Sequence, residues 1–227
     1  NFVNATGWPA ENHYSTAADL AILSRALIRD FPQHYSLYAE RNFTYNGITQ
    51  PNRNSLLSLN DTVDGIKTGH TEEAGYCLVA SAIRDGMRLI SVITGANSDR
   101  ARASESQKLL TYGFRFYETR KVYAAQEKIL DTQIYKGQSD TLAITTLSDV
   151  FLTFPRGRSE QIETKLDLPK VIYAPITMAQ ELGSMSFILE GEAIASQPLV
   201  AAQNIEQGGV FKRLWHSIKL FFAGLFK

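Results

Sequence analysis

A strand–turn–strand pattern in the middle of the chain constrains the fold more than any other feature. Residues 77–84 (CLVASAIR) and 87–95 (MRLISVITG) are two apolar, strand-like runs, and the Asp85-Gly86 pair between them favours a two-residue hairpin turn. Both runs are too apolar to keep one face in water, because half-solvated strands alternate apolar and polar residues. We therefore expect an antiparallel hairpin with helices packed on at least one of its faces.

The segment 15–30 (STAADLAILSRALIRD) has the apolar spacing of a helix. Ser15 is expected to cap its start, and Phe31-Pro32 is expected to end it. The apolar face of this helix is formed by Leu20, Leu23, Leu27 and Ile28.

A second helix is predicted over residues 100–119, despite Gly113. Between the two helices, the turn-rich segment 42–54 contains Asn46-Gly47, a pair that favours a small hairpin. The buried side of the second helix is predicted to consist of Leu109, Leu110, Phe114 and Tyr117.

The character of the chain changes after Arg120. Short β-prone runs separated by turn residues follow one another, with no long helical pattern before Gly208-Gly209, which is typical of a small all-β sandwich. The sequence therefore predicts an α/β (α+β) part over residues 1–120, an all-β domain over 121–208 and an amphipathic helix over 209–227. The runs are KVYA, TQIYKG, TLAITTL, DVFLTFP, QIETKLDL, VIYAPI, SMSFILEG and PLVAAQNI.

Composition excludes several classes of function. The chain has 227 residues and a formal net charge of zero, so no basic field points to a nucleic-acid partner. Cys77 is the single cysteine, which rules out an internal disulfide. There is no run of about 18 apolar residues, the length that a membrane-spanning helix requires. The chain begins at Asn1 without a signal peptide, and we expect it to be part of a longer protein.

The stretch VDGIKTGHT, residues 63–71, has the chemistry of an anion site at the start of a predicted strand. Lys67 supplies a positive charge and Thr68 a hydroxyl donor. Gly69 leaves room for a ligand to lie against the backbone. The backbone N–H of His70 can be offered to a developing oxyanion.

Together with the hairpin and helix that follow, this stretch resembles the penicillin-binding-protein and serine β-lactamase superfamily, in which K-T-G on a strand is one of three catalytic signatures. Further segments narrow the resemblance to the low-molecular-mass D-alanyl-D-alanine carboxypeptidases, over essentially the whole chain and in the right order. These segments are GWPAENHYSTAADLAILSRALIRDFPQHYSLY, NRNSLL, KLLTYGFRFYET, FPRGR within the β-domain, and the amphipathic tail.

The resemblance implies a transpeptidase-like catalytic domain and a serine-type carboxypeptidase that trims peptidoglycan pentapeptides and is inhibited by β-lactam antibiotics. It implies no cofactor, and no pair of histidines has metal-ligand spacing. The S-x-x-K motif of the nucleophilic serine does not occur in the chain, and Ser58-Leu59-Asn60 fits S-x-N only by coincidence, since it lies a few residues before Lys67. The serine is therefore expected upstream, in an N-terminal part of the same protein that would be the partner of this chain.

The resemblance also assigns roles to individual residues. Lys67 is expected to act in catalysis, and the His70 N–H to form half of the oxyanion hole. Thr68, with Gly69 beside it, is expected to bind the substrate carboxylate. Arg102 matches a family arginine that assists carboxylate binding, and Arg53 in NRN matches another arginine near the cleft.

Other residues that often carry chemistry have simpler interpretations. His13, His34 and His216 are expected at the surface. Cys77 lies on an apolar strand and is expected to be a small buried hydrophobic residue rather than a nucleophile.

The tail, FKRLWHSIKLFFAGLFK, is strongly amphipathic, with its large apolar residues inside an arc of about 140° and Leu220 as the exception. This pattern predicts a helix lying in a membrane interface, peripheral to the periplasmic face of the bacterial cytoplasmic membrane. A helix that caps the β-domain is the alternative, against which Gly208-Gly209 is expected to be a flexible joint. The predicted anchor residues are Phe211, Trp215, Ile218, Phe222 and Leu225.

Two other functions stay open at this point. The chain could belong to a non-catalytic, membrane-tethered module that binds or spaces cell-wall proteins. Alternatively, the enzyme could act mainly as an endopeptidase on cross-links or as a β-lactamase.

Overall fold

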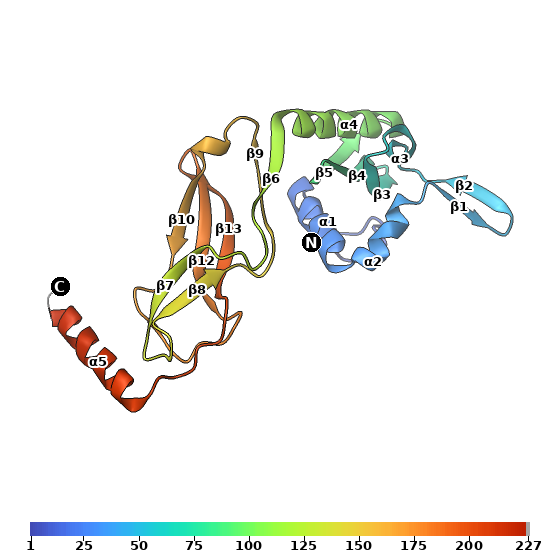
Figure 1. The fold of residues 1–227 in the computed structure, drawn as a ribbon. Helices are drawn as coiled ribbons and strands as arrows, with labels where there is room; N and C mark the ends of the chain where they lie inside the picture. The colour runs from blue at the N-terminus through green and yellow to red at the C-terminus, as the bar shows by residue number, and fades with distance from the viewer. Residues whose placement is uncertain (226–227) are drawn as a thin grey trace. The chain divides into compact units, whose positions relative to one another are not determined.

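The computed structural model describes residues 1–225, with side chains described up to residue 222, and divides into two compact units, Asn1–Tyr117 and Glu118–Lys227. We describe each unit by itself (Figure 1). The first unit contains α1 (Ala17–Asp30), α2 (Pro32–Tyr35), η1 (Ser36–Ala39), β1 (Asn42–Tyr45), β2 (Ile48–Pro51), α3 (Leu56–Leu59), β3 (Val63–Thr71), β4 (Gly75–Arg84), β5 (Met87–Ala96) and α4 (Asp99–Phe116).

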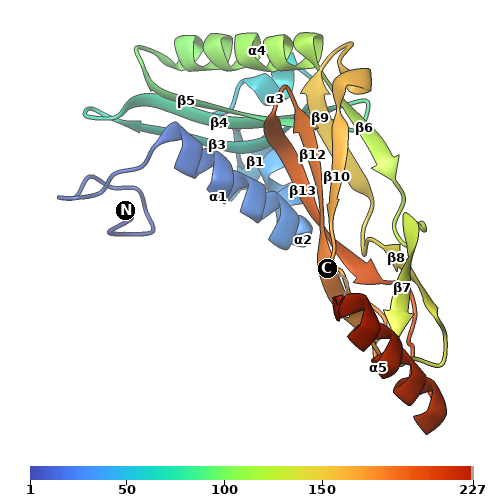
Figure 2. The same ribbon diagram turned by 90° about the vertical axis from the view of Figure 1, so that its left-hand side faces the viewer.

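An antiparallel sheet with the order β3-β4-β5 forms the centre of the first unit. The predicted turn between β4 and β5 is confirmed, because Asp85 and Gly86 have φ angles of 50° and 79°, in the left-handed region that this turn requires. Figure 2 shows α4 along one face of the sheet and α1 along the other. The expectation of helices on this hairpin is therefore confirmed.

The helix boundaries correct two details of the sequence analysis. Thr16, not Ser15, caps α1: its hydroxyl accepts from the N–H of Asp19, whose carboxylate in turn accepts from the Thr16 N–H. This reciprocal pair satisfies two backbone donors at once, which Ser15 could not do without an acid three residues later. The second helix ends at Phe116, because Tyr117 is already extended and begins the next strand.

The hairpin predicted at Asn46-Gly47 is formed by β1 and β2. All eight of its strand residues are exposed, so it contributes no side chain to the core of the first unit. That core consists instead of residues from α3, the central sheet and α4, including Leu56, Leu78, Ala80 and Leu110.

The second unit contains the short strands expected from the sequence. They form one sheet with the order β10-β12-β13-β8-β7-β11 and a two-stranded sheet of β6 and β9. The strands are β6 (Tyr117–Tyr123), β7 (Leu130–Tyr135), β8 (Thr141–Thr145), β9 (Val150–Pro155), β10 (Glu163–Asp167), β11 (Ile172–Tyr173), β12 (Glu181–Leu189) and β13 (Glu192–Ala201).

A closed core fills the second unit, with Leu142, Phe154, Met185, Phe187 and Leu199 each no more than 2% exposed. A C-terminal helix, α5 (Val210–Leu225), follows the last strand. The predicted fold class, an α/β part followed by a β-domain and a C-terminal helix, is therefore confirmed. Within residues 1–225, none of the helices has the length and apolar character needed to cross a bilayer.

Candidate functional site

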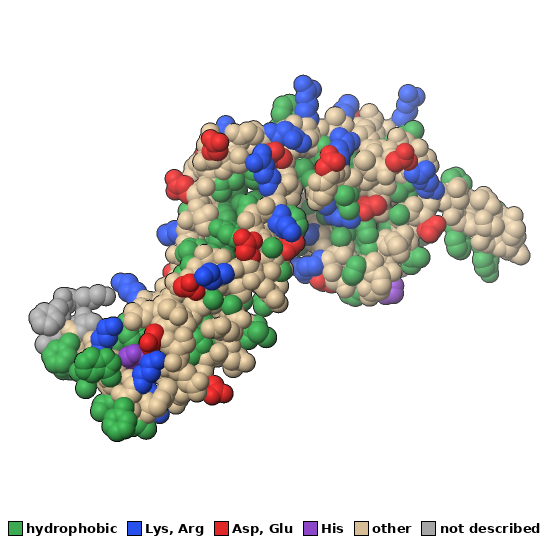
Figure 3. Space-filling view, viewed as in Figure 1, with side chains coloured by type: hydrophobic (Ala, Val, Ile, Leu, Met, Phe, Trp, Pro, Cys, Tyr) green, Lys and Arg blue, Asp and Glu red, His purple; other side chains and the backbone are tan. Residues whose placement is uncertain are grey.

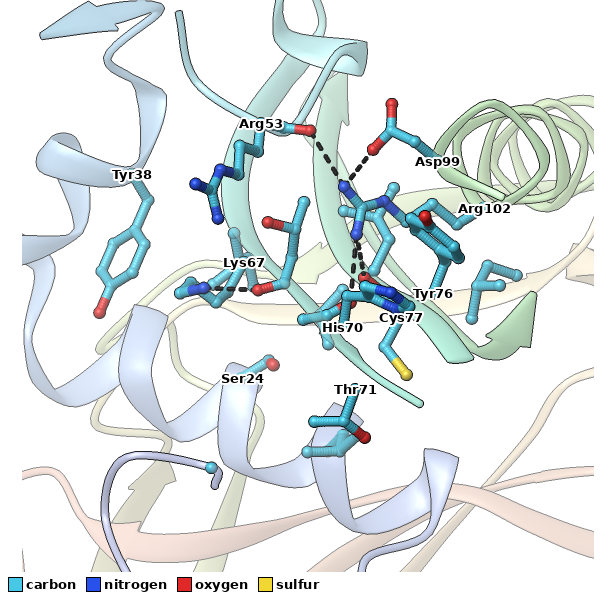
Figure 4. Close-up of a pocket in the computed structure, with 18 of the residues that line it drawn as sticks. Ser24, Tyr38, Arg53, Lys67, His70, Thr71, Tyr76, Cys77, Asp99 and Arg102 are labelled. Carbon is cyan, nitrogen blue, oxygen red and sulfur yellow. Dashed lines mark hydrogen bonds and ion pairs between the residues drawn. The ribbon is translucent and has the colours of Figure 1, made fainter. Parts of the chain in front are cut away.

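The KTG motif lies in the middle of β3, not at its start as the sequence suggested, because Val63 begins the strand and Lys67 is the fifth of its nine residues. The register places Lys67 opposite Val79 and Gly69 opposite Cys77 on β4. A cleft of about 1630 Å³ runs along this strand, between β3 and the apolar face of α1 (Figure 4). All four residues from Lys67 to His70 line it.

Basic and aromatic side chains surround one part of this cleft. Lys67 is exposed, and its Nζ donates to the carbonyl of Thr68 at 2.5 Å. Figure 4 shows Lys67, Arg53 and Tyr38 extending into the same open space beside β3. The arrangement brings two cations and a hydroxyl to the strand edge, where an anionic ligand would be attracted.

Arg102, in the first turns of α4, is buried, with only 5% of the residue exposed. Its Nη1 donates to the carbonyls of Gly69 at 3.1 Å and Cys77 at 3.3 Å. Its Nη2 donates to the carbonyl of Arg53 at 3.4 Å and pairs with Asp99. One guanidinium therefore connects β3, β4, the loop before α3 and α4 (Figure 4).

The side chain of His70 packs against protein. Its ring is stacked on the ring of Tyr76 at a centroid distance of 3.9 Å, and its Nδ1 lies 3.2 Å from the carbonyl of Gly75. The guanidinium of Arg102 lies 5.5 Å from the Tyr76 ring centroid, a cation–π distance. These contacts fix the end of β3 and leave the backbone of His70 as its candidate functional group.

Cys77 departs from the sequence interpretation. It is only partly buried, lines the cleft, and its Sγ lies 3.4 Å from the carbonyl of Ala74. The alternation of β4 turns Cys77 away from the core, which takes Leu78 instead.

Two side-chain amides make hydrogen bonds near the start of β3. Asn54, which the sequence did not single out, is 2% exposed and donates to the carbonyl of Gly65 at 3.0 Å. Asn60 accepts from the backbone N–H of Thr62 and donates to Gln107. The side-chain amide of Asn60 is thus bonded to Thr62 and Gln107, and the interpretation of Ser58-Leu59-Asn60 as a coincidental match stays a prediction. The position of Asn54 at the end of the turn-rich segment, shortly before the apolar pair Leu56-Leu57, was the available signal.

A polar cluster that was not predicted from the sequence lies at the start of β3. Asp64 accepts from the Tyr35 hydroxyl at 3.0 Å and pairs with Arg88 at 2.8 Å, and Arg88 also donates to Ser81. Burial of the phenol is the main cause that raises the pKa of Tyr35 to about 12. The cluster ties α2, β3, β4 and β5 together with charge-assisted hydrogen bonds.

The histidines are not all at the surface. His34 is exposed as predicted, and His13 is half-buried, with its Nδ1 accepting from the N–H of Val3. His216, in the second unit, is 8% exposed, so its predicted surface position is wrong. In the part of the chain that the structure describes, His, Cys, Asp and Glu side chains do not gather in any group of three that could hold a metal ion.

Comparisons with known families match the chain in two parts. Residues 1–98 match the family described as D-alanyl-D-alanine carboxypeptidase. Residues 117–207 match the C-terminal domain of penicillin-binding protein 5.

Curated relatives and a solved structure match nearly the whole chain. It is 44% identical to the D-alanyl-D-alanine carboxypeptidase DacA of Escherichia coli K12, over 98% of this chain and 56% of the relative. It is 40% identical to DacA of Haemophilus influenzae, over 100% of this chain and 58% of the relative. The structure of penicillin-binding protein 5 from Haemophilus influenzae superposes with a TM-score of 0.79 at 40% identity, over 88% of this chain and 59% of that one. The chain thus spans a little over half the length of the curated relatives that it matches.

Proposed function

The chain belongs to the low-molecular-mass penicillin-binding proteins of the D-alanyl-D-alanine carboxypeptidase family, and on this premise we propose that the whole protein removes the terminal D-alanine from peptidoglycan pentapeptides. A serine attacks the D-Ala-D-Ala carbonyl, D-alanine leaves, and water then hydrolyses the acyl-enzyme. β-Lactam antibiotics acylate the same serine and inhibit the enzyme. The serine and its lysine base come from another part of the same protein, since S-x-x-K does not occur in residues 1–227.

The observation that carries this proposal is the position of residues 67–70 along one wall of the cleft. Lys67 supplies positive charge at the acylation transition state, and the Thr68 hydroxyl binds the substrate carboxylate. Gly69 lets the substrate approach the strand, and the His70 N–H contributes half of the oxyanion hole. The exposed guanidinium of Arg53 adds a second cation at the same end of the cleft.

Arg102 supports this strand indirectly in our proposal. Its two terminal nitrogens already donate to the Gly69, Cys77 and Arg53 carbonyls and pair with Asp99, and the side chain has little access to solvent. An arginine has donors only, so each one spent on a carbonyl is withdrawn from a ligand. Arg102 therefore keeps the end of β3 in place, and the substrate carboxylate is left to Thr68, Lys67 and Arg53.

The activity is tested by measuring D-alanine release from a pentapeptide by the whole protein, with and without penicillin. Mass spectrometry of the penicillin adduct then locates the acylated serine. We expect release that penicillin blocks, and an adduct outside residues 1–227. An adduct on any serine of these residues, or a whole protein that neither releases D-alanine nor binds penicillin, would contradict the proposal, and the second result would favour a non-catalytic module.

We further propose that α5 attaches the protein to the periplasmic face of the cytoplasmic membrane. Six of its large apolar side chains are exposed: Phe211, Leu214, Trp215, Ile218, Phe221 and Phe222. Figure 3 shows hydrophobic side chains gathered along α5. Of the predicted anchor residues, Leu225 has a helical backbone, but its side chain lies outside the described residues.

An exposed apolar face of this size, flanked by the exposed cations Arg213 and Lys219, suits an interface with anionic lipid. Deletion of residues 211–227 should release the whole protein from the membrane fraction while its penicillin binding is kept. A truncated protein that still sediments with membranes would place the anchor elsewhere.

A further inference from the structure

Helix α5 has a second face, opposite to its exposed apolar one. Lys212, His216 and Leu220 follow each other at four-residue spacing and therefore lie on one side of the helix. His216 is 8% exposed and Leu220 is half-buried, whereas Phe211 is 89% and Trp215 is 66% exposed. Leu220, the one exception to the amphipathic pattern, thus belongs to a face that contacts protein.

The contacts of His216 identify what this face is packed against. Its Nδ1 accepts from the backbone N–H of Lys136 at 2.7 Å. A neutral ring that accepts at Nδ1 carries its proton on Nε2, and Nε2 lies 3.6 Å from the Asp140 carboxylate. The ring of Tyr135 meets the imidazole edge-on, at a centroid distance of 5.5 Å. Residues 136–140 connect β7 to β8, and we call them the β7–β8 turn.

Lys212 contacts the same turn one helical turn earlier. Its Nζ donates to the carbonyl of Gln138 at 2.9 Å and pairs with Asp140 at 2.8 Å. The hydrogen bond from Lys212 to the Asp140 carboxylate is the largest cause that lowers the pKa of Asp140 below its usual range. Figure 3 shows acidic and basic side chains next to the hydrophobic cluster of α5.

The backbone that leads into α5 is held by the turn as well. The N–H of Gly208 donates to the carbonyl of Lys136 at 2.9 Å, and a Cβ at position 208 would lie 2.7 Å from the carbonyl oxygen of Gly137. Gly208 is therefore a buried point of close backbone approach, which argues against a flexible joint at this position.

We propose that His216 and Lys212 dock the polar face of α5 onto the β7–β8 turn, so that the helix presents its apolar face to an anionic lipid surface in one fixed orientation. This inference rests on the proposed membrane attachment for its partner, but the docking exists in solution before any lipid is bound. The docked face uses Lys212 and His216 within the protein. The lipid headgroups are left to Arg213 and Lys219, whose side chains are exposed.

The first test measures hydrogen exchange of the Lys136 amide in the whole protein, without lipid. His216→Ala removes the acceptor of that amide, and its exchange should become roughly tenfold faster or more. His216→Asn keeps an oxygen near the place of Nδ1 and should restore most of the protection. Arg213→Ala is the control on an exposed cation of α5 and should leave exchange unchanged. Equal protection in native protein and His216→Ala, with circular dichroism showing both folded, would overturn the docking.

A second test measures how α5 is placed, with spin labels on Thr164→Cys in β10 and Ser217→Cys in α5, in protein that also carries Cys77→Ser. We expect one narrow distance distribution, broadened by His216→Ala and preserved by His216→Asn. A distribution that is already broad with His216 in place would contradict the docking.

Flotation on vesicles containing phosphatidylglycerol tests the membrane attachment separately. Failure to float with intact docking would refute the lipid partner alone. If the protein floats but the first two tests show that α5 is not docked, only the fixed orientation of the helix would be refuted.

Discussion

The end of β3 and the start of α5 are held in the same way, but by side chains of opposite hydrogen-bonding character. Arg102 is 5% exposed and gives its donors to the carbonyls of Gly69 and Cys77. His216 is 8% exposed and offers an acceptor to the N–H of Lys136. In each case a side chain from a helix satisfies the backbone of a segment distant in the sequence, as buried backbone groups require.

The difference lies in what each contact leaves exposed. The hydrogen bonds of Arg102 hold β3 so that polar groups of the strand lie on the wall of a cleft, where a ligand can bind. The hydrogen bond of His216 holds α5 so that the apolar face of the helix stays exposed and can bind to another surface. We infer that a buried basic residue beside an exposed surface can act by orienting that surface, without touching what binds to it.

Lys67 is proposed to act directly on the substrate, whereas Arg102 and His216 are proposed to position other groups. Substitution of Lys67 should therefore have the largest effect on the rate of acylation. In the whole protein, Lys67→Ala should slow acylation by penicillin by roughly two to four powers of ten, because a preorganised charge is lost at the transition state. Its stability should change little, since the side chain is exposed. Lys108→Ala, on an exposed lysine paired with Glu105, is the control and should keep the native rate. Near-normal acylation of Lys67→Ala would refute its role.

Adjacent glycines before α5 offer a matched pair. Gly208→Ala places a methyl group against the carbonyl of Gly137 and should destabilise the second unit by about 1–3 kcal/mol. A Cβ at Gly209 meets nothing within 4 Å, so Gly209→Ala should change stability by no more than about 0.5 kcal/mol. Urea unfolding followed by fluorescence measures both values. Similar effects of the two changes would mean that position 208 is a free joint after all.

The Tyr35 cluster makes stability depend on alkaline pH. The folded protein holds the phenol neutral up to a pKa of about 12, compared with an unfolded value of 10.0. The folded state therefore binds more protons than the unfolded state between these values, and its stability should fall as pH rises from about 10 to 12. Tyr35→Phe should remove this part of the decline and cost about 1–2 kcal/mol at pH 8 through the lost bond to Asp64.

Tyr45→Phe is the control for this titration, because Tyr45 is 75% exposed on the β1–β2 hairpin. Unfolding free energies across the alkaline range measure both variants. An unchanged pH slope in Tyr35→Phe would show that its burial does not control the alkaline transition.

Two apolar residues of α5 should show the smallest and most opposed effects. Leu220→Ser removes a half-buried side chain and should cost about 1 kcal/mol. Phe211→Ser alters a side chain that is 89% exposed and should change stability by no more than about 0.5 kcal/mol. Vesicle binding should rank the variants in the opposite order, with Phe211→Ser the weaker binder. The same ranking in both measurements would mean that α5 has no separate protein-facing side.

Local signals in the sequence predicted much of the fold. The pairs Asn46-Gly47 and Asp85-Gly86 located two hairpins, because each supplies positive φ angles at low cost. Alternating short runs located the strands of the second unit. The cap of α1 was also readable, since Thr16 precedes Asp19 at the spacing of a capping box, but Ser15 carries the same hydroxyl and was preferred.

Contacts between distant residues could not be predicted in this way. His216 is buried by a turn 80 residues earlier in the chain, and the helical pattern of the tail shows only that His216 is on the polar side. Arg102 was predicted to be part of the site, but three of its contacts are with backbone carbonyls, which carry no side-chain signature. Cys77 was predicted to be buried from the apolar run around it, whereas its register opposite Gly69 turns it to the cleft.

The most direct measurement compares Arg102→Ala with the native whole protein on two peptides that end in D-Ala-D-Ala, one with a free carboxylate and one with a carboxamide. An arginine that only positions β3 should affect both substrates alike, so kcat/KM should fall by the same factor, within about twofold, for acid and amide. An arginine that pairs with the substrate carboxylate would lower kcat/KM for the acid at least about tenfold more than for the amide. The second result would contradict the proposal that Arg102 acts only by positioning β3.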